Sequence, residues 1–220
     1  MMDDLRAATF DYKGKELAFI GARVQEERLL RQKQFENEKY EVKVTEVVKG
    51  SKGDVFIDIG AYLGYFSFLA SESFGRVVAI EAHPLRFGAL AYNAGHFSNI
   101  RAIWGYAGKA LLNPSHMCGD FFYANNPGKK IPNVEFDHEF VDIESLVREG
   151  ETAMIKIDVE GGEGSVIDSC SKGFLSDPRV AWIIEIHHSV TSPSYLEEKF
   201  SGRTITPVAE GRNISKIMVT

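Results

Sequence analysis

The sequence predicts an α/β domain with a doubly wound, mostly parallel sheet. Short apolar runs of strand length alternate along the chain with segments whose apolar residues recur at helical spacing. The chain has 220 residues, 44% of them hydrophobic, which suits one domain with its own core. We expect an N-terminal helical extension over residues 1–50 and a main domain over residues 51–220. Strands are expected at residues 55–59, 76–81, 99–107, 153–159, 180–186, 204–208 and 215–220, with helices at 66–74, 143–149, 162–173 and 192–200 and another beginning near residue 84.

The N-terminal extension is expected to be two helices. Leu17, Ile20 and Val24 lie on one stripe if residues 14–37 are helical, and a second helix is expected over residues 38–49 before a Gly-rich turn. Its basic side chains alternate with acidic ones, which favours a solvated face over an anion site.

A glycine loop follows the first strand of the main domain. Asp58 ends the strand, and Gly60 and Gly64 complete the pattern Asp-x-Gly-x-x-x-Gly, which differs from the Gly-x-Gly-x-x-Gly dinucleotide fingerprint. Glycines allow a sharp turn and close approach of a ligand, and the next helix is expected to begin with free backbone N–H groups. The Asp58 carboxylate favours a cationic ammonium over a phosphate. The alternative is an ordinary strand-to-helix turn.

A second acid, Glu81, ends the next strand, about twenty residues after the glycine loop. In sheets wound in this way, an acid at that position accepts hydrogen bonds from both hydroxyls of a ribose. The alternative is that Glu81 caps the helix that starts near Pro84, where a negative charge suits the helix dipole.

The strand at residues 153–159 delivers two acids to the same edge of the sheet. Asp158 and Glu160 are the best candidates for the reacting centre, because they lie on one side of the strand if it stays extended. Lys156 either keeps one acid charged or extends outward to solvent. Glu163 falls in the first turn of the following helix, where stabilising the dipole competes with a role in ligand binding.

His187 and His188 follow the strand at residues 180–186, at the same edge. An imidazole with a near-neutral pKa could remove a proton, so His187 joins the catalytic candidates. The alternative is one structural and one solvated histidine. A hard-metal cluster of Asp158, Glu160, Glu185 and His187 is the least favoured reading, because no helical or Cys-x-x-Cys ligand spacing supports it, and no metal is expected.

With these segments together, the chain resembles the FkbM-type family of S-adenosylmethionine (SAM) dependent methyltransferases. The matching text is VFIDIGAYLGYFSFLAS, then VVAIEAHP with Asn93 further along, then VDIESLV, IKIDVEGGE and WIIEIH, all in family order between about residues 38 and 190. The resemblance implies a seven-stranded, Rossmann-like methyltransferase sheet with an antiparallel last strand, and methyl transfer usually to oxygen.

The resemblance also implies a cofactor site at the strand ends. Its positions are Asp58, Gly60, Ala61, Tyr62, Gly64, Tyr65 and Phe66 in the glycine loop, Glu81, Ala82 and His83 after the second strand, and Tyr106 and Ala107 after the third. The loop is implied to hold the methionine part, Glu81 the ribose, and Asp158 is implied to lie beside the sulfonium. Residues 106–109 read Tyr-Ala-Gly-Lys, without the acid that the family often has, so adenine contacts are expected from backbone groups and from packing against Ala82, His83 or the tyrosine.

The composition and net charge indicate which class of methyl acceptor and which cellular compartment to expect. A formal net charge of −6 argues against sequence-independent nucleic-acid binding and favours a small-molecule or saccharide acceptor. An RNA or protein methyltransferase and a non-catalytic SAM-binding protein remain the alternatives, and homo-oligomer formation is left open. Cys118 and Cys170 stand far apart, and the chain shows no membrane span or signal peptide, so a cytoplasmic location is expected. The acceptor pocket is expected in residues 108–137 and the N-terminal helices.

Overall fold

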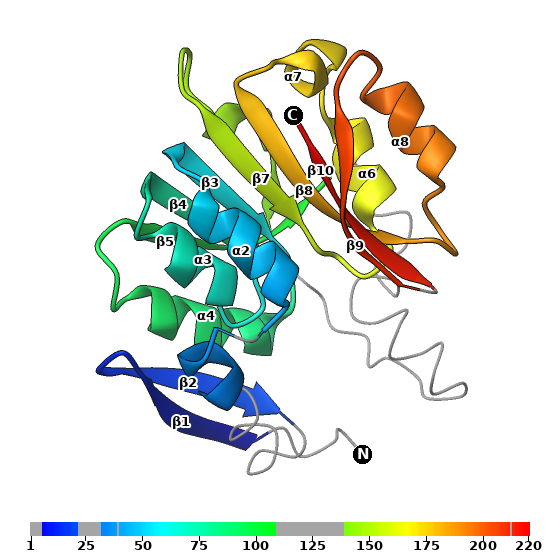
Figure 1. The fold of residues 1–220 in the computed structure, drawn as a ribbon. Helices are drawn as coiled ribbons and strands as arrows, with labels where there is room; N and C mark the ends of the chain where they lie inside the picture. The colour runs from blue at the N-terminus through cyan, green and yellow to red at the C-terminus, as the bar shows by residue number, and fades with distance from the viewer. Residues whose placement is uncertain (1–5, 22–31, 39, 109–138, 212) are drawn as a thin grey trace.

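The computed structural model describes residues 6–21, 32–38, 40–108, 139–211 and 213–220. Its largest element is an eight-stranded sheet with the order β6-β5-β4-β3-β7-β8-β10-β9 (Figure 1). Neighbouring strands are parallel except at β10, which is antiparallel to both β8 and β9. The strands are β3 (Gly53–Ile59), β4 (Phe74–Glu81), β5 (Ile100–Ala107), β6 (Glu139–Val141), β7 (Ala153–Ile157), β8 (Val180–His187), β9 (Ile205–Glu210) and β10 (Ile214–Val219).

This architecture confirms the predicted α/β fold with a mostly parallel sheet and an antiparallel last strand. All seven expected strands are present, and β6 adds an eighth at the edge, beside β5. The helices are α2 (Val42–Gly50), α3 (Tyr65–Ala70), α4 (Pro84–Ala94), α6 (Glu163–Ser169), α7 (Lys172–Ser176) and α8 (Pro193–Lys199).

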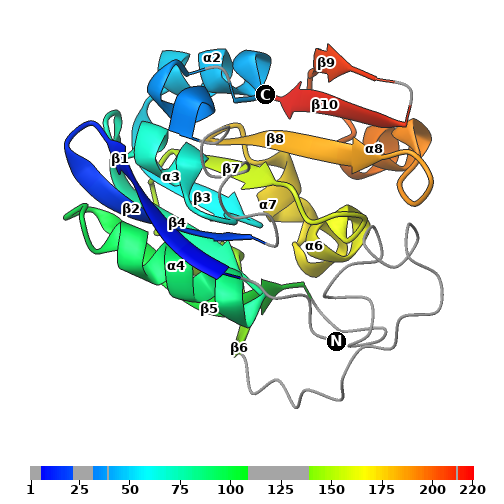
Figure 2. The same ribbon diagram turned by 90° about the horizontal axis from the view of Figure 1, so that it is seen from below.

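The sheet carries a hydrophobic core on each face. Figure 2 shows from below that helices lie on both sides of the sheet. Along β3 the side chains alternate: Val55 and Ile57 join α6, α7 and α8 in one core, whereas Phe56 joins α2 and α3 in the other. Because every core position of β3 is buried on one face or the other, the strand reads as a continuous apolar run, as is typical of parallel strands covered on both sides.

The N-terminal segment departs from the prediction. Residues 6–21 form an antiparallel hairpin of β1 (Arg6–Tyr12) and β2 (Lys15–Gly21), so the helix expected to begin at residue 14 is wrong over β2. Burial alternates with a period of two on both strands, and Lys13 and Gly14 both have positive φ, at 52° and 77°, as a two-residue hairpin turn requires. Residues 32–36 and α2 are helical, and residues 22–31 lie outside the described residues.

Other boundaries also differ. The helix expected at residues 162–173 is broken into α6 and α7, because Ser171 caps α7: its hydroxyl accepts from the Phe174 N–H at 3.2 Å. The helix expected at residues 143–149 is a short 3₁₀ turn at Glu144–Leu146. The strand-like pieces expected around residues 111 and 121–123 lie outside the described residues.

The side chain of Asn93 in α4 connects the hairpin to the main domain. This fully buried amide accepts from the Ala18 N–H at 2.6 Å and donates to the carbonyls of Ala18 and Leu63 at 3.1 and 3.0 Å. Three hydrogen bonds therefore join β2, α4 and the glycine loop. The division of the chain at residue 50 stays a proposal.

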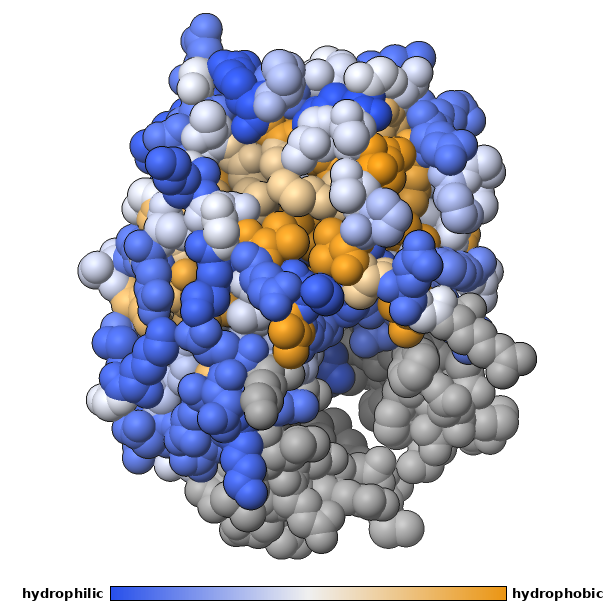
Figure 3. Space-filling model, in the orientation of Figure 1, coloured by the Kyte–Doolittle hydropathy of each residue, from blue (hydrophilic) through white to orange (hydrophobic). Residues whose placement is uncertain are grey.

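The face of the molecule drawn in Figure 3 is mainly hydrophilic where its residues are described, with an apolar area over α2 and the neighbouring β8–β10 region. Ala181, Val208 and Met218 of these strands are only partly buried. Among the described residues, no helix is long and apolar enough to cross a bilayer. The cytoplasmic location stays a prediction.

Candidate active site

The glycine loop turns where β3 meets the carboxyl end of β7. Gly60 has φ +78°, and a Cβ there would lie 1.8 Å from the backbone oxygen of Asp158, so only glycine fits. The N–H groups of Gly60 and Ala61 donate to the Ile80 carbonyl, and that of Gly64 donates to Ala61. Two of these groups bind the loop to β4 and the third closes a turn within the loop, whereas the prediction of free N–H groups concerned the first turn of the next helix, α3, which begins at Tyr65.

Glu81 connects the glycine loop to the start of α4. Its buried carboxylate accepts from the N–H of Tyr62 at 2.9 Å and from that of His83 at 2.8 Å. The N-cap of α4 is His83, whose Nδ1 accepts from the Arg86 N–H at 3.4 Å. Glu81 is therefore not the capping residue of α4. Burial raises the pKa of Glu81, with Arg86 and the two hydrogen bonds acting in the opposite direction.

Lys156 is a buried cation shared by two acids. Its Nζ donates to Asp158 at 3.1 Å, lies 3.7 Å from Asp58 Oδ1, and sits 4.8 Å from the centroid of the Phe66 ring. Burial acts to lower its pKa, but the two carboxylates more than reverse this, so the ammonium stays charged. Of the two expectations for Lys156, the partner of an acid is confirmed and the outward-extending residue is wrong.

The two acids bound to Lys156 differ in their environment. Burial raises the pKa of Asp58, although its Oδ2 accepts from the Ser67 hydroxyl at 2.7 Å. Burial acts in the same direction on Asp158, but Lys156 overcomes it and lowers the pKa of that carboxyl. Asp158 is therefore ionised at neutral pH.

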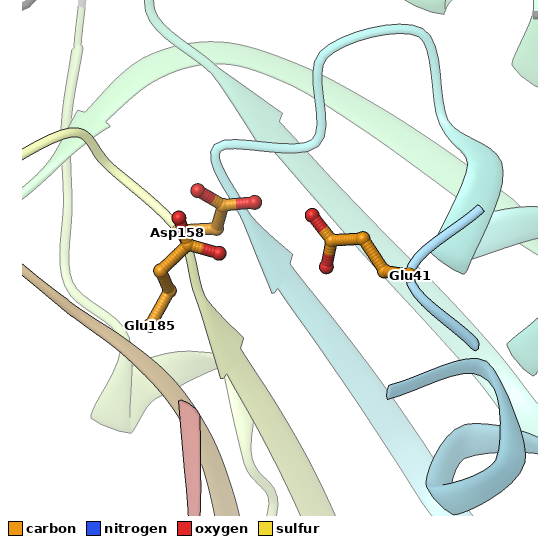
Figure 4. Close-up of side chains that lie close together, drawn as sticks. All are labelled: Glu41, Asp158 and Glu185. Atoms are coloured by element: carbon orange, nitrogen blue, oxygen red, sulfur yellow. The ribbon is translucent and has the colours of Figure 1, made fainter. Parts of the chain in front are cut away.

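A second charged cluster lies beside Asp158 and joins distant parts of the chain. One carboxylate oxygen from each of Glu41, Asp158 and Glu185 lies within 4.8 Å of the others (Figure 4). Lys216 of β10 pairs with Glu185, its cross-strand partner on β8, and with Glu41 at 2.9 Å. Such a group of oxygens suits a hard cation, but the Lys216 ammonium already supplies positive charge to two of them. Glu41 and Lys216 were not anticipated from the sequence.

His187 is enclosed by acids. Its Nδ1 hydrogen bonds to Glu163, and its Nε2 lies 3.3 Å from Glu160 and 3.9 Å from Glu185. Its contacts with Glu160 and Glu163 raise the pKa of His187 to about 10, against the opposing effect of burial. The expected near-neutral imidazole is wrong, because His187 is protonated at neutral pH and is a donor.

Glu160 and Glu163, the other two acids in the segment after β7, have different contacts from those predicted. The strand ends at Ile157, and Glu160 has φ +52°, so Glu160 turns toward His187 and does not continue the face of Asp158. Glu163 is fully buried and accepts from the Gly161 N–H at 3.2 Å and the Thr191 hydroxyl at 3.3 Å, besides binding His187. The helix dipole alone does not explain so many partners.

The remaining predicted positions lie around the same edge, with different exposure. Tyr65 points into the core, where its hydroxyl lies 3.2 Å from Thr45 and its ring 4.4 Å from that of Phe35. Ala61, Phe66 and Ala107 are buried, whereas Tyr62, Ala82, His83 and Tyr106 are partly exposed, and His188 is exposed with its Nε2 at 2.9 Å from Ser215.

A strand, a glycine loop and a helix, followed by an acid on the next strand of a sheet with an antiparallel last strand, define a Rossmann-like methyltransferase fold. The family model described as methyltransferase FkbM domain matches residues 58–200, and the chain belongs to this family. Its domain is a SAM-dependent methyltransferase. Asp58 fits a cationic cofactor, because its buried Oδ1 accepts no hydrogen bond from the described residues and has only the longer ion pair with Lys156, at 3.7 Å.

Solved structures agree on the fold. A methyltransferase FkbM from Methylobacillus flagellatus aligns with a TM-score of 0.54 and 17% identity over 77% of this chain, which spans 44% of that protein. Fibrillarin from Aeropyrum pernix, solved with natively bound S-adenosyl-L-methionine, aligns with a TM-score of 0.51 and 15% identity over 97% of this chain and 82% of its own. A search of curated proteins found no match.

Proposed function

We propose that this chain transfers the methyl group of SAM to a hydroxyl of a small molecule or saccharide. The observation that carries the proposal is the acidic character of the edge beyond β7 and β8. Asp158 and Glu185 lie there with Glu41, and the nearby cations Lys156 and Lys216 are already paired with these acids. A phosphate backbone would meet repulsion at this surface, whereas a neutral hydroxyl can donate a hydrogen bond to it.

The roles proposed for the cofactor half follow from the contacts. Asp58 faces the methionine ammonium, since its Oδ1 accepts no hydrogen bond from the described residues and lies 3.7 Å from Lys156 Nζ, which leaves it able to accept one from the cofactor. Gly60, Ala61 and Gly64 let the methionine part approach the loop. Glu81 accepts from the ribose hydroxyls with the lone pairs that Tyr62 and His83 leave free. Ala82, His83, Tyr106 and Ala107 contribute to the adenine side, and Tyr65 and Phe66 support the loop from the core.

SAM supplies a methyl group on a good leaving group, so the chain has to align the acceptor and accept its proton. Asp158 is suited to hold the acceptor hydroxyl, because Lys156 keeps its carboxylate ionised at neutral pH. His187 is held in its charged form by Glu160 and Glu163, so it orders the segment after β7 and does not act as the base.

A screen with isotope-labelled SAM tests the proposal. The purified chain is incubated with separate pools of sugars, glycolipids, tRNA and peptides, and the methylated atom is located by mass spectrometry. We expect a methylated hydroxyl in a sugar, glycolipid or other small molecule, and labelling lowered by about 100-fold or more in an Asp158→Asn control. Labelling of tRNA or peptide would contradict the acceptor class, and tight SAM binding without transfer to any pool would favour the non-catalytic alternative.

A further inference from the structure

We infer that Glu185 accepts the proton of the acceptor hydroxyl during methyl transfer, and that Lys216 and Glu41 hold its carboxylate in place. This inference rests on the proposed transfer to a hydroxyl. Glu185 stands one strand away from Asp158, and a carboxylate oxygen of each lies within 4.8 Å of the other (Figure 4). A hydroxyl held by Asp158 is therefore within reach of a second carboxylate.

Position and access agree with this role. The Glu185 side chain is 13% exposed, so it is largely shielded from water but is not closed off completely. Its cross-strand neighbour Lys216 pairs with its Oε2 and with Glu41. The other oxygen, Oε1, lies 3.9 Å from His187 Nε2, beyond hydrogen-bonding distance, which leaves it able to accept a proton.

The support for Glu185 comes from two segments that are far apart in the chain. Lys216 belongs to the last strand, while Glu41 precedes α2 near the other end of the described sheet domain. Glu41 has φ +43°, an uncommon conformation for a residue with a side chain. Such backbone strain is typical of functional sites, and at Glu41 it places a side chain that pairs with Lys216, which in turn holds the Glu185 carboxylate.

Burial and the charged groups around Glu185 and Asp158 together shift the pKa values of these two acids in opposite directions. Burial and the charge of Asp158 raise the pKa of Glu185, while Lys216 acts to lower it and Glu41 to raise it. Asp158 has a lowered pKa, and His187 on the other side is charged. A base works best when its pKa lies near the working pH, so of two neighbouring carboxylates Glu185 is the better proton acceptor and Asp158 the better anion to orient the hydroxyl.

The step balances without another reagent. The acceptor oxygen forms a bond to the methyl carbon, the carbon–sulfur bond breaks with its electron pair passing to the sulfur, and the hydroxyl proton moves to Glu185. The products are the methyl ether, neutral S-adenosylhomocysteine and a protonated Glu185, which returns its proton to water after the products leave.

Glu185→Gln tests the assignment, with Glu151→Gln as the matched control. Glu151 is a shielded acid of the same kind, 17% exposed and paired with Arg76, but it precedes β7 at the opposite end of that strand. On the acceptor found in the screen, we expect Glu185→Gln to lower kcat by about 100-fold or more. SAM affinity by calorimetry should change less than about threefold, and Glu151→Gln should leave both values near wild type.

Two further measurements separate a proton acceptor from a structural residue. In the wild type kcat should fall at low pH as a carboxylate becomes protonated, and Glu185→Gln should lose this dependence. Glu185→Ala should recover part of its activity with added formate, a small carboxylate, whereas Glu41→Ala should not.

Several outcomes would overturn the inference: near wild-type kcat in a folded Glu185→Gln protein, equal losses of kcat and SAM affinity, or wild-type activity that disappears with a chelator and returns with magnesium. The methylated atom distinguishes the two proposals. A methylated nitrogen contradicts the proposed acceptor class, whereas a methylated oxygen with an active Glu185→Gln protein contradicts only the role of Glu185.

Discussion

The proposed cofactor half of the site, around the glycine loop and Glu81, is joined by contacts between residues close in sequence, whereas the proposed acceptor half, around Glu185, joins residues far apart in the chain. In the cofactor half, Glu81 accepts from the Tyr62 N–H across 19 residues, and Ser67 donates to Asp58 across 9. In the acceptor half, Glu41 near the start and Lys216 in the last strand meet at Glu185. Short-range hydrogen bonds therefore fix the first half, and long-range ion pairs fix the second.

Lys156 lies between the two halves, and its loss should have the largest effect. Lys156→Met leaves Asp58 and Asp158 without their buried cation, so we expect the free energy of unfolding to fall by about 3–5 kcal/mol in urea titrations. Lys49→Met, which removes an exposed pair with Glu38, should cost about 1 kcal/mol or less. Equal losses in the two variants would show that Lys156 does not connect the halves.

The crossing of the glycine loop over β7 is the next most sensitive point. Gly60→Ala combines an unfavourable φ of +78° with a clash against the Asp158 backbone, so we expect a loss of about 3 kcal/mol of unfolding free energy or more. Gly88→Ala is the control: this exposed glycine lies inside α4 with no atom within 4 Å of a new Cβ, and it should gain about 0.5–1 kcal/mol. A Gly60→Ala protein as stable as the wild type would contradict the close crossing.

Glu81→Ala should affect the cofactor half alone. The loss of hydrogen bonds to a charged group is expected to weaken SAM binding by about 1.5–3 kcal/mol, measured by calorimetry. Glu151→Ala should leave SAM affinity unchanged. An unaltered affinity in folded Glu81→Ala protein would remove Glu81 from the cofactor site, and tighter binding of NAD than of SAM by the wild type would move the chain to another class of enzyme.

His187 should make the acceptor half sensitive to alkaline pH. Its pKa rises from 6.5 to about 10 in the folded chain, so its contribution to stability is complete below pH 6.5 and is lost as pH rises through about 10. The unfolding free energy of the wild type should therefore fall over this range more steeply than that of His187→Gln. An NMR titration that finds the His187 imidazole half-protonated near pH 7 would contradict the enclosure by Glu160 and Glu163.

The contrast between the halves also explains what the sequence could predict. The strand ends, the glycine loop and Glu81 could be predicted, because in each case an acid or a glycine directly follows an apolar run. Glu41 and Lys216 were not, because their roles depend on the antiparallel register that sets Lys216 opposite Glu185. The N-terminal hairpin was missed although a local signal existed: Lys13-Gly14 lies between segments that alternate with a period of two. Glu160 was misplaced because the strand ends at Ile157.

We claim that SAM binding and methyl transfer depend on different residues. Asp158→Asn tests this claim most directly, because it keeps the shape of the side chain and removes its charge. Turnover on the identified acceptor and SAM affinity by calorimetry are measured on the same folded preparation. We predict that turnover falls by about 100-fold or more while SAM affinity stays within about threefold of the wild type. Turnover near the wild-type level, or a loss of SAM affinity as large as the loss of turnover, would contradict the assignment of Asp158 to the acceptor half.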